Sequence, residues 1–202
     1  MNESKEHMII ISSKLFLQKS YKGVTMKEIV ENTGLSKGAF YHYFESKEQL
    51  FLEVLDYFFQ GMVRNYENYS KDSLQQFYND YIYETIRLTN NYLKKFNDPK
   101  TEASTTLNYF SLIFDALKLF PAFRDKVTDG FNKEIEQWAK AVERARSQGE
   151  VKSKMSDKEI GETFLYLSDG VMMHMIMRDM DIDDTVQLFK NLWDKFYAEI
   201  RA

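Results

Sequence analysis

Residues suited to contact a nucleic-acid backbone are concentrated between positions 25 and 47. They combine hydroxyls, amines, an imidazole and small side chains: Thr25, Ser36, Lys37, Gly38, Ala39, Tyr41, His42, Tyr43 and Lys47. Hydroxyls, amines and the N–H groups at helix starts donate hydrogen bonds to phosphate oxygens. A helix with Gly38 and Ala39 on its outer face can come close to base edges in the major groove. This combination predicts contact with double-stranded DNA.

The elements that must position these residues are two short helices joined by a tight turn. Thr25-Met26-Lys27-Glu28 is a capping box that opens the first of them. Gly34 tolerates the left-handed backbone that ends a helix. Ser36 caps the second short helix, which is expected to reach about His42. Together with a longer helix over about Lys5–Lys19, this is the layout of a helix-turn-helix, whose second helix enters the major groove.

The charge of this region is only weakly basic. Up to Leu50 the chain has seven lysines and six glutamates, a net charge of +1, whereas the whole chain carries −4. Its first arginine is Arg64, so the region lacks the side chain that most often reads guanine. We predict readout by Lys37, by Ala39 against a thymine methyl and by DNA shape, on an A·T-rich operator. The competing interpretation is that the aromatic residues form a helix seam and the lysines are ordinary solvated side chains.

The segment Thr25–Leu50 resembles the DNA-binding motif of TetR/AcrR-family bacterial transcriptional regulators. The resemblance is carried by the threonine-led helix, Gly34-Leu35-Ser36-Lys37-Gly38, Tyr41, Phe44, Ser46-Lys47-Glu48, Leu50 and, in the preceding helix, Phe16. It covers about the first quarter of the chain. It implies an all-helical repressor that binds DNA as a homodimer and responds to a small molecule held among its central helices.

Four residues depart from the family pattern. Ser20 stands where the family often has glycine, and Ser12 where it often has alanine. Because both replacements are small, we expect little effect on packing. The family commonly places histidine immediately before the phenylalanine that follows the recognition helix. This chain has Tyr43 there and His42 one residue earlier, and both side chains can donate to phosphate.

The central part of the chain carries many aromatic residues interleaved with hydroxyls. The resemblance implies an effector pocket in this part. The residues predicted to line it are Tyr81, Thr85, Phe110, Phe114 and Trp138. A cavity that is mostly apolar with a few polar groups suits a small apolar or aromatic molecule. The competing interpretation is that aromatic residues at helical spacing form ordinary core.

The last two predicted helices carry wide apolar stripes at helical spacing. The predicted homodimer interface consists of Phe164, Leu167, Val171, Met175, Phe189, Leu192, Trp193 and Phe196. Leu167-Ser168-Asp169-Gly170 resembles the small-residue stretch of the corresponding family helix, which implies a four-helix interface between two subunits. Intramolecular core must account for some of these residues. Two heads related by symmetry would read a pseudo-palindromic operator.

Several classes of protein are not indicated by any motif. The chain has no cysteine and only three scattered histidines, so no disulfide or metal site is expected. It has no phosphate-binding glycine loop and no nucleophile elbow. No apolar stretch approaches the length of a membrane span. We therefore expect a cytoplasmic protein that is not an enzyme, has no cofactor and does not act at a membrane.

The scarcity of helix-breaking residues, 2 prolines and 8 glycines in 202 residues, predicts an all-α fold of about nine helices. After the head, helices are expected to begin near Ser46, Ser73, Asp98-Pro99, Thr128, Ser156 and Asp183, with a broken turn over 122–127. Residues 1–47 are predicted to form the DNA-binding domain, and residues 48–202 the effector-binding and dimerisation domain. The leading hypothesis is a dimeric ligand-responsive repressor. The alternative is a helical small-molecule carrier or interaction module with a vestigial DNA head.

Overall fold

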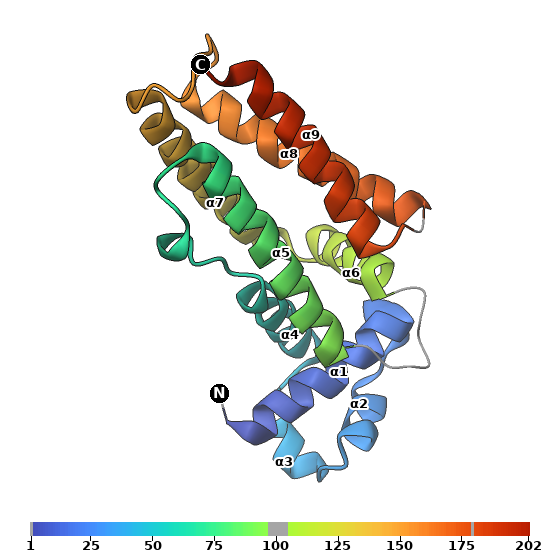
Figure 1. Cartoon of the computed structure of the whole chain (residues 1–202). Coiled ribbons are helices and arrows are strands. Elements are labelled where there is room, and N and C mark those ends of the chain that lie inside the picture. Colours follow the sequence, from blue (N-terminus) through green and yellow to red (C-terminus); the bar gives the residue numbers. More distant parts are fainter. Residues whose placement is uncertain (1, 97–104, 179) are drawn as a thin grey trace. The chain divides into compact units, whose positions relative to one another are not determined.

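The computed structural model of the chain describes residues 2–96, 105–178 and 180–202. Its elements in chain order (Figure 1) are α1 (Glu3–Gly23), α2 (Met26–Thr33), α3 (Lys37–Tyr41), α4 (Lys47–Gly61), the 3-10 turn η1 (Tyr66–Asn68), α5 (Leu74–Phe96), α6 (Thr105–Leu119), α7 (Pro121–Ser147), α8 (Asp157–Arg178) and α9 (Ile182–Ile200). Over these described ranges the only β-type pairing is the isolated bridge between Val151 and Arg201. The predicted all-α fold is confirmed.

Local capping signals begin several helices where the sequence predicts. At α4, the Gln49 N–H donates to the Ser46 hydroxyl oxygen at 3.1 Å. At α8, the bonds of the capping box are reciprocal. The Glu159 N–H donates to Ser156 Oγ at 3.2 Å, and the Ser156 N–H donates to Glu159 Oε2 at 2.7 Å. These bonds satisfy N–H groups that have no partner inside the helix.

Two helix starts differ from prediction. The broken turn predicted over 122–127 is wrong, because α7 begins at Pro121 and runs through this segment. Proline at the first helical position sacrifices no hydrogen bond, so it starts a helix there instead of breaking one. The last helix begins directly after Asp181, whose Oδ1 accepts the N–H of Asp184 at 2.8 Å. The start predicted at Asp98-Pro99 lies outside the described residues.

The contacts within the chain divide it into two compact units. The head unit, as we name it, comprises Met1–Val63 and Leu88–Phe123, and the body unit comprises Arg64–Arg87 and Arg124–Ala202. The head unit therefore includes α4, α6 and the end of α5 in addition to the three amino-terminal helices. The division into domains 1–47 and 48–202 stays a prediction.

The head unit is organised around α1, which contacts α2, α4 and α6. Phe16 and Phe51 are fully buried and meet edge to face, with ring centroids 5.0 Å apart. Ser12 and Ser13 are also fully buried. Each donates its hydroxyl to the carbonyl four residues earlier in the helix, at 2.7 and 2.6 Å. These bonds remove the cost of burying a hydroxyl, so both serines fit an apolar contact surface.

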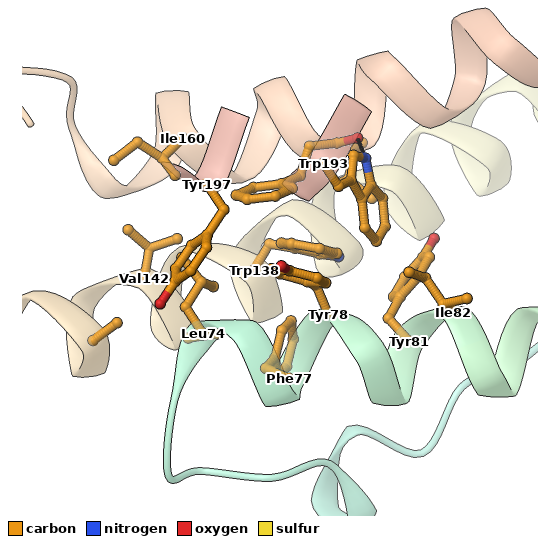
Figure 2. Packing of buried hydrophobic residues seen from close by; sticks show 14 of the residues in the cluster. Leu74, Phe77, Tyr78, Tyr81, Ile82, Trp138, Val142, Ile160, Trp193 and Tyr197 are labelled. Carbon is orange, nitrogen blue, oxygen red and sulfur yellow. Dashed lines mark hydrogen bonds between the residues drawn. The ribbon is translucent and has the colours of Figure 1, made fainter. Parts of the chain in front are cut away.

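The body unit encloses an aromatic core centred on Trp138 (Figure 2). The fully buried indoles of Trp138 and Trp193 lie 5.1 Å apart, and Trp138 stacks on Phe164 at 5.0 Å. Trp193 Nε1 donates to the carbonyl oxygen of Phe164 at 2.7 Å. Aromatic burial and this hydrogen bond together hold α9 on α8.

This packing involves the residues of the predicted dimer interface. Five of its residues are already buried within the single chain: Phe164, Val171, Met175, Phe189 and Trp193. The other three, Leu167, Leu192 and Phe196, are half-buried and pack against the same core. The five buried side chains present little surface to a second chain, in line with the interpretation that intramolecular core accounts for part of the set. The interface assignment of these residues stays a prediction.

One carboxylate links three distant segments of the body unit. Both oxygens of Glu150 accept the N–H of Leu74, at 3.0 and 2.9 Å, at the start of α5. The hydroxyl of Tyr197 on α9 donates to Glu150 Oε1 at 2.7 Å. The negative charge also lies at the end of α5 that the helix dipole makes positive. Glu150 thus acts as the cap of a helix 76 residues away in sequence.

Two further findings apply to the described ranges alone. No helix in them combines the length and the apolar character needed to cross a bilayer. No three or more acidic or histidine side chains in them are grouped closely enough to hold a metal ion.

Candidate nucleic-acid interface

Helix α3 presents a thin outer face. Lys37, Gly38 and Ala39 are exposed, whereas Phe40 is fully buried and packs on Phe44 with ring centroids 5.7 Å apart. The helix is therefore anchored through one aromatic side while its smallest residues face solvent. A helix with this surface can bring its backbone close to base edges. The burial of Phe40 and Phe44 agrees with the interpretation that these two aromatic residues pack between helices instead of contacting DNA.

The turn before α3 is set by one glycine. Gly34 has φ +68° and ψ 7°, the left-handed conformation that other residues rarely adopt. The Ser36 hydroxyl then accepts the N–H of Ala39 at 3.2 Å and begins α3. His7 of α1 reaches the same turn, with Nε2 3.1 Å from the carbonyl oxygen of Thr33. The conformation of the turn is thus set by Gly34 and by the contact of His7 on α1 with the Thr33 carbonyl.

Two predicted DNA contacts, Tyr41 and His42, are also exposed. Tyr41 is 38% exposed, and the Lys37 ammonium lies 5.8 Å from its ring centroid. His42 is exposed and meets Tyr43 edge to face at 5.2 Å. Lys37, Tyr41 and His42 therefore lie at the surface of one short segment, where they could donate to phosphate or bases. Their contact with DNA stays a prediction.

Tyr43 has a partner that sequence reasoning missed. The side-chain amide of Asn2 donates to the Tyr43 hydroxyl oxygen at 3.1 Å. A phenol that accepts one hydrogen bond keeps its own proton for donation. Asn2 therefore orients Tyr43 without using the proton that a phosphate would accept. The two residues are 41 positions apart, so no local pattern predicts the pair.

Lys47 is directed into the protein. Its ammonium donates to the carbonyl oxygens of Tyr21 at 3.0 Å and Val24 at 2.9 Å, and lies 4.4 Å from the Tyr21 ring centroid. These carbonyls end α1, so Lys47 joins the end of α1 to the start of α4. The side chain is half-buried. Lys47 thus has a structural role that the predicted phosphate contact did not include.

Thr25 is exposed at the start of α2, where its hydroxyl oxygen accepts the N–H of Glu28 at 3.2 Å. The Glu28 carboxylate also accepts a hydrogen bond from Lys19, and this bond lowers the pKa of Glu28. Thr25 therefore caps α2 as predicted. Its hydroxyl proton remains available to a phosphate, beside the paired charges of Lys19 and Glu28.

The five residues predicted to line an effector pocket are divided between the units. Phe110 and Phe114 lie on α6 of the head unit, and the Phe114 side chain is 55% exposed. Tyr81, Thr85 and Trp138 belong to the body unit. There Trp138 is fully buried, with its ring centroid 5.3 Å from that of Tyr81. Part of the aromatic pattern is therefore core, and the pocket assignment of these residues stays a prediction.

An exposed apolar face remains on α8 beside the buried stripe. It consists of Tyr166, Gly170, Met173 and Met177, which follow one another at intervals of four, three and four residues. The side chains of Tyr166, Met173 and Met177 are 59%, 41% and 65% exposed. Residues at these intervals lie on one side of a helix. We name this surface the outer face of α8.

Comparison with known proteins agrees with the helix-turn-helix. Residues 12–54 match the family model of bacterial regulatory proteins, tetR family. The uncharacterized HTH-type transcriptional regulator YerO of Bacillus subtilis is 40% identical over 72 residues, 36% of this chain and 25% of that protein. IcaR of Staphylococcus epidermidis, the negative transcriptional regulator of the biofilm operon icaADBC, is 29% identical over 85 residues, 40% of this chain and 46% of that protein. The chain thus spans a quarter to about half the length of these relatives.

The likeness in fold extends over the whole chain. The crystal structure of a TetR transcription regulator from Haloarcula marismortui matches with a TM-score of 0.73 and 14% identity, covering 100% of both chains. At this identity the match shows the fold alone. The family model and the related regulators supply the sequence evidence. Residues 12–54 thus match the helix-turn-helix of the tetR family of bacterial regulatory proteins, and the chain shares the all-helical fold of solved TetR regulators.

Proposed function

We propose that this protein is a transcriptional repressor that binds a pseudo-palindromic DNA operator as a homodimer and leaves it when a small apolar or aromatic effector binds. The observation that carries the proposal is the surface of α3, where Lys37, Gly38 and Ala39 are exposed above a buried Phe40. That IcaR is a negative regulator supports repression. Such a protein has no catalytic role.

The operator is expected to be rich in A·T pairs. Lys37 is the sole basic residue of α3, and α1 to α3 contain no arginine. Without an arginine fork, guanine contacts are limited to what one lysine per half-site provides. Ala39 suits contact with a thymine methyl group. DNA shape then supplies the remaining specificity.

The surface that we propose for the homodimer is the outer face of α8. Exposed apolar side chains that follow one helix face mark association surfaces more often than scattered ones. A symmetric dimer would place two copies of α3 on half-sites about 34–36 Å apart or a multiple of this. Such a dimer reads twice as many base pairs as one head.

The dimer proposal is tested by the mass of the protein in solution. Met173→Glu combined with Met177→Glu places two charges on the outer face of α8, and we expect a shift from dimer to monomer in analytical ultracentrifugation. Phe131→Glu is the matched control, because Phe131 is a 54% exposed apolar residue on α7. Equal masses for the two variants and the wild type would contradict this choice of surface.

DNA binding is tested by a salt series on random duplex and on sites selected from genomic fragments. A repressor that neutralises phosphates loses affinity steeply as salt rises from about 50 to 200 mM. Lys37→Ala should cost about 1–3 kcal/mol on the selected site and relax one base position. Lys154→Ala, an exposed lysine between α7 and α8, controls for the loss of one positive charge. A flat or absent salt response in the wild type would favour the carrier alternative.

A further inference from the structure

A group of polar residues borders the aromatic core of the body unit. It consists of Arg64, Tyr66, Tyr81 and Glu134, and we name it the Arg64 cluster. The guanidinium carbon of Arg64 lies 3.8 Å from the ring centroid of Tyr81, and Arg64 Nε lies 3.4 Å from Glu134 Oε1. The side chains of Arg64 and Glu134 are 15% and 24% exposed. The cluster is therefore mostly buried, yet it reaches solvent.

The Glu134 carboxylate already has its donors. The hydroxyls of Tyr66 and Tyr81 donate to Oε1 at 3.0 and 2.9 Å, and Arg64 approaches the same oxygen through Nε. Arg64 Nη1, by contrast, is buried and has no hydrogen-bond partner among the described residues. A guanidinium binds a carboxylate through two parallel N–H groups. Arg64 thus retains a donor that Glu134 does not use.

One more buried polar atom near the cluster, Trp138 Nε1, has no hydrogen bond within the described residues. The Trp138 ring lies 5.3 Å from Tyr81, and its nitrogen is on the side of the ring toward Tyr81 (Figure 2). Arg64 and Trp138 can both donate. A buried donor without an acceptor is costly, so a ligand that brings acceptor oxygens would relieve this cost.

We propose that the Arg64 cluster, with Trp138, is the effector site of the repressor and that it takes a small aromatic carboxylate. The ligand carboxylate would accept from Arg64, and its ring would lie beside Tyr81 and Trp138. This inference rests on the proposed function, because it names the chemical class of the effector assumed there.

The buried donors of the site favour a ligand with acceptor oxygens over a cation. A cationic ligand would instead have to compete with Arg64 for Glu134 and Tyr81, and it would bring no acceptor to the buried donors.

Arg64 also occupies a position from which binding can affect the head. It follows the last residue of α4, Gly61, by three positions and is the first residue of the body unit. A ligand that engages Arg64 therefore acts on the segment of chain that leads directly out of α4. We expect aromatic carboxylates to lower operator affinity through this connection.

The experiment compares matched acids and amides on the full chain. Benzoate, 1-naphthoate and indole-3-acetate are titrated by calorimetry and thermal shift beside benzamide, 1-naphthamide and indole-3-acetamide. We expect at least one acid to bind about tenfold more tightly than its amide, because only the acid forms a charge-assisted pair. Arg64→Gln should reduce this ratio to about one, whereas Trp138→Phe should weaken the acid and leave the ratio above one. The ratio of acid affinity to amide affinity is measured within each folded variant, so a loss of stability does not mimic the result.

The outcomes separate this inference from the function on which it rests. If acids and amides bind equally, if none of them binds, or if benzyltrimethylammonium binds more tightly than every acid, the carboxylate assignment is overturned. Operator binding with a steep salt dependence would then still support the repressor. If the acids bind through Arg64 but the chain binds no DNA, the site stands and the repressor proposal fails. Release of operator by the acid in the wild type, absent in Arg64→Gln, supports both.

Discussion

Trp138 and Gly161 are in direct contact in the body unit. A β-carbon added to Gly161 would lie 2.9 Å from Cβ of Trp138 and 3.3 Å from the backbone nitrogen of Ala139. Gly161 is buried, and no side chain larger than hydrogen fits there without movement of α7 or α8. This close approach allows Trp138 to stack on Phe164, the aromatic residue one turn further along α8.

Gly161→Ala is expected to destabilise the protein by about 1–3 kcal/mol, because the added methyl group must displace the backbone of α7. Gly130→Ala is the matched control, since Gly130 lies in α7 with nothing within 4 Å of its added β-carbon. There alanine should stabilise by about 0.5–1 kcal/mol through helix propensity. Urea denaturation measures both. Equal stability of Gly161→Ala and the wild type would show that α7 and α8 accommodate the added methyl group without cost.

Ser20→Gly is expected to stabilise the head unit. Ser20 has φ 61° and ψ 169°, a conformation essentially reserved for glycine, at the point where α1 is interrupted. Such strain costs about 1–3 kcal/mol, of which glycine recovers about 1 after its own entropy cost. Ser13→Gly, in the helical part of α1, should instead destabilise, because it also loses the bond to the Ile9 carbonyl. Denaturation curves that rank the two variants in the opposite order would refute this reading of Ser20.

Lys47→Met is expected to lower stability by about 1–3 kcal/mol, because two carbonyls at the end of α1 lose a charged donor. Lys22→Met, at an exposed lysine of the same helix end, should change stability little. Thermal denaturation measures the effect, and operator binding is then compared below the melting temperature. Wild-type stability with uniformly weaker DNA binding would instead support a phosphate contact by Lys47.

Asp169→Asn is expected to stabilise the protein at neutral pH. The pKa of Asp169 is raised from 3.8 to about 6 by burial and by Glu134, so the native state holds this proton more tightly than the unfolded state. Its contribution is therefore greatest below about pH 4 and declines as pH rises through about 6. The advantage of Asp169→Asn should be present near pH 7.5 and absent near pH 4. Glu136→Gln, an exposed carboxyl on α7, controls for removal of one negative charge.

The features that sequence reasoning predicted well are local. The cap of Thr25 on Glu28 and the left-handed Gly34 depend on residues within four positions of each other, so their chemistry can be recognised without the fold. Ser20 was assessed by size, whereas the structure shows that backbone conformation decides at this position. The sequence signal for this conformation was that Ser20 stands where the family often has glycine.

The features that were missed depend on distant parts of the chain. An apolar stripe on α9 shows that one face is buried but not what covers it. Trp193 was therefore predicted to lie in a dimer interface, although the core of its own chain encloses it. The direction of the Lys47 ammonium depends on carbonyls more than 20 residues earlier. The Arg64 cluster joins residues from η1, α5 and α7 and leaves no motif in the sequence.

The hydrogen bonds of Glu150 have a further consequence for local unfolding of the body unit. One carboxylate group bonds to the first turn of α5 and to the Tyr197 hydroxyl on α9, while its own backbone oxygen accepts the N–H of Ala202. Neither helix end can fray alone without leaving this charge partly unsatisfied. Amide hydrogen exchange at Leu74 and at the end of α9 should therefore change together, as one cooperative unit, and Glu150→Ala, which removes the shared acceptor, should uncouple the two.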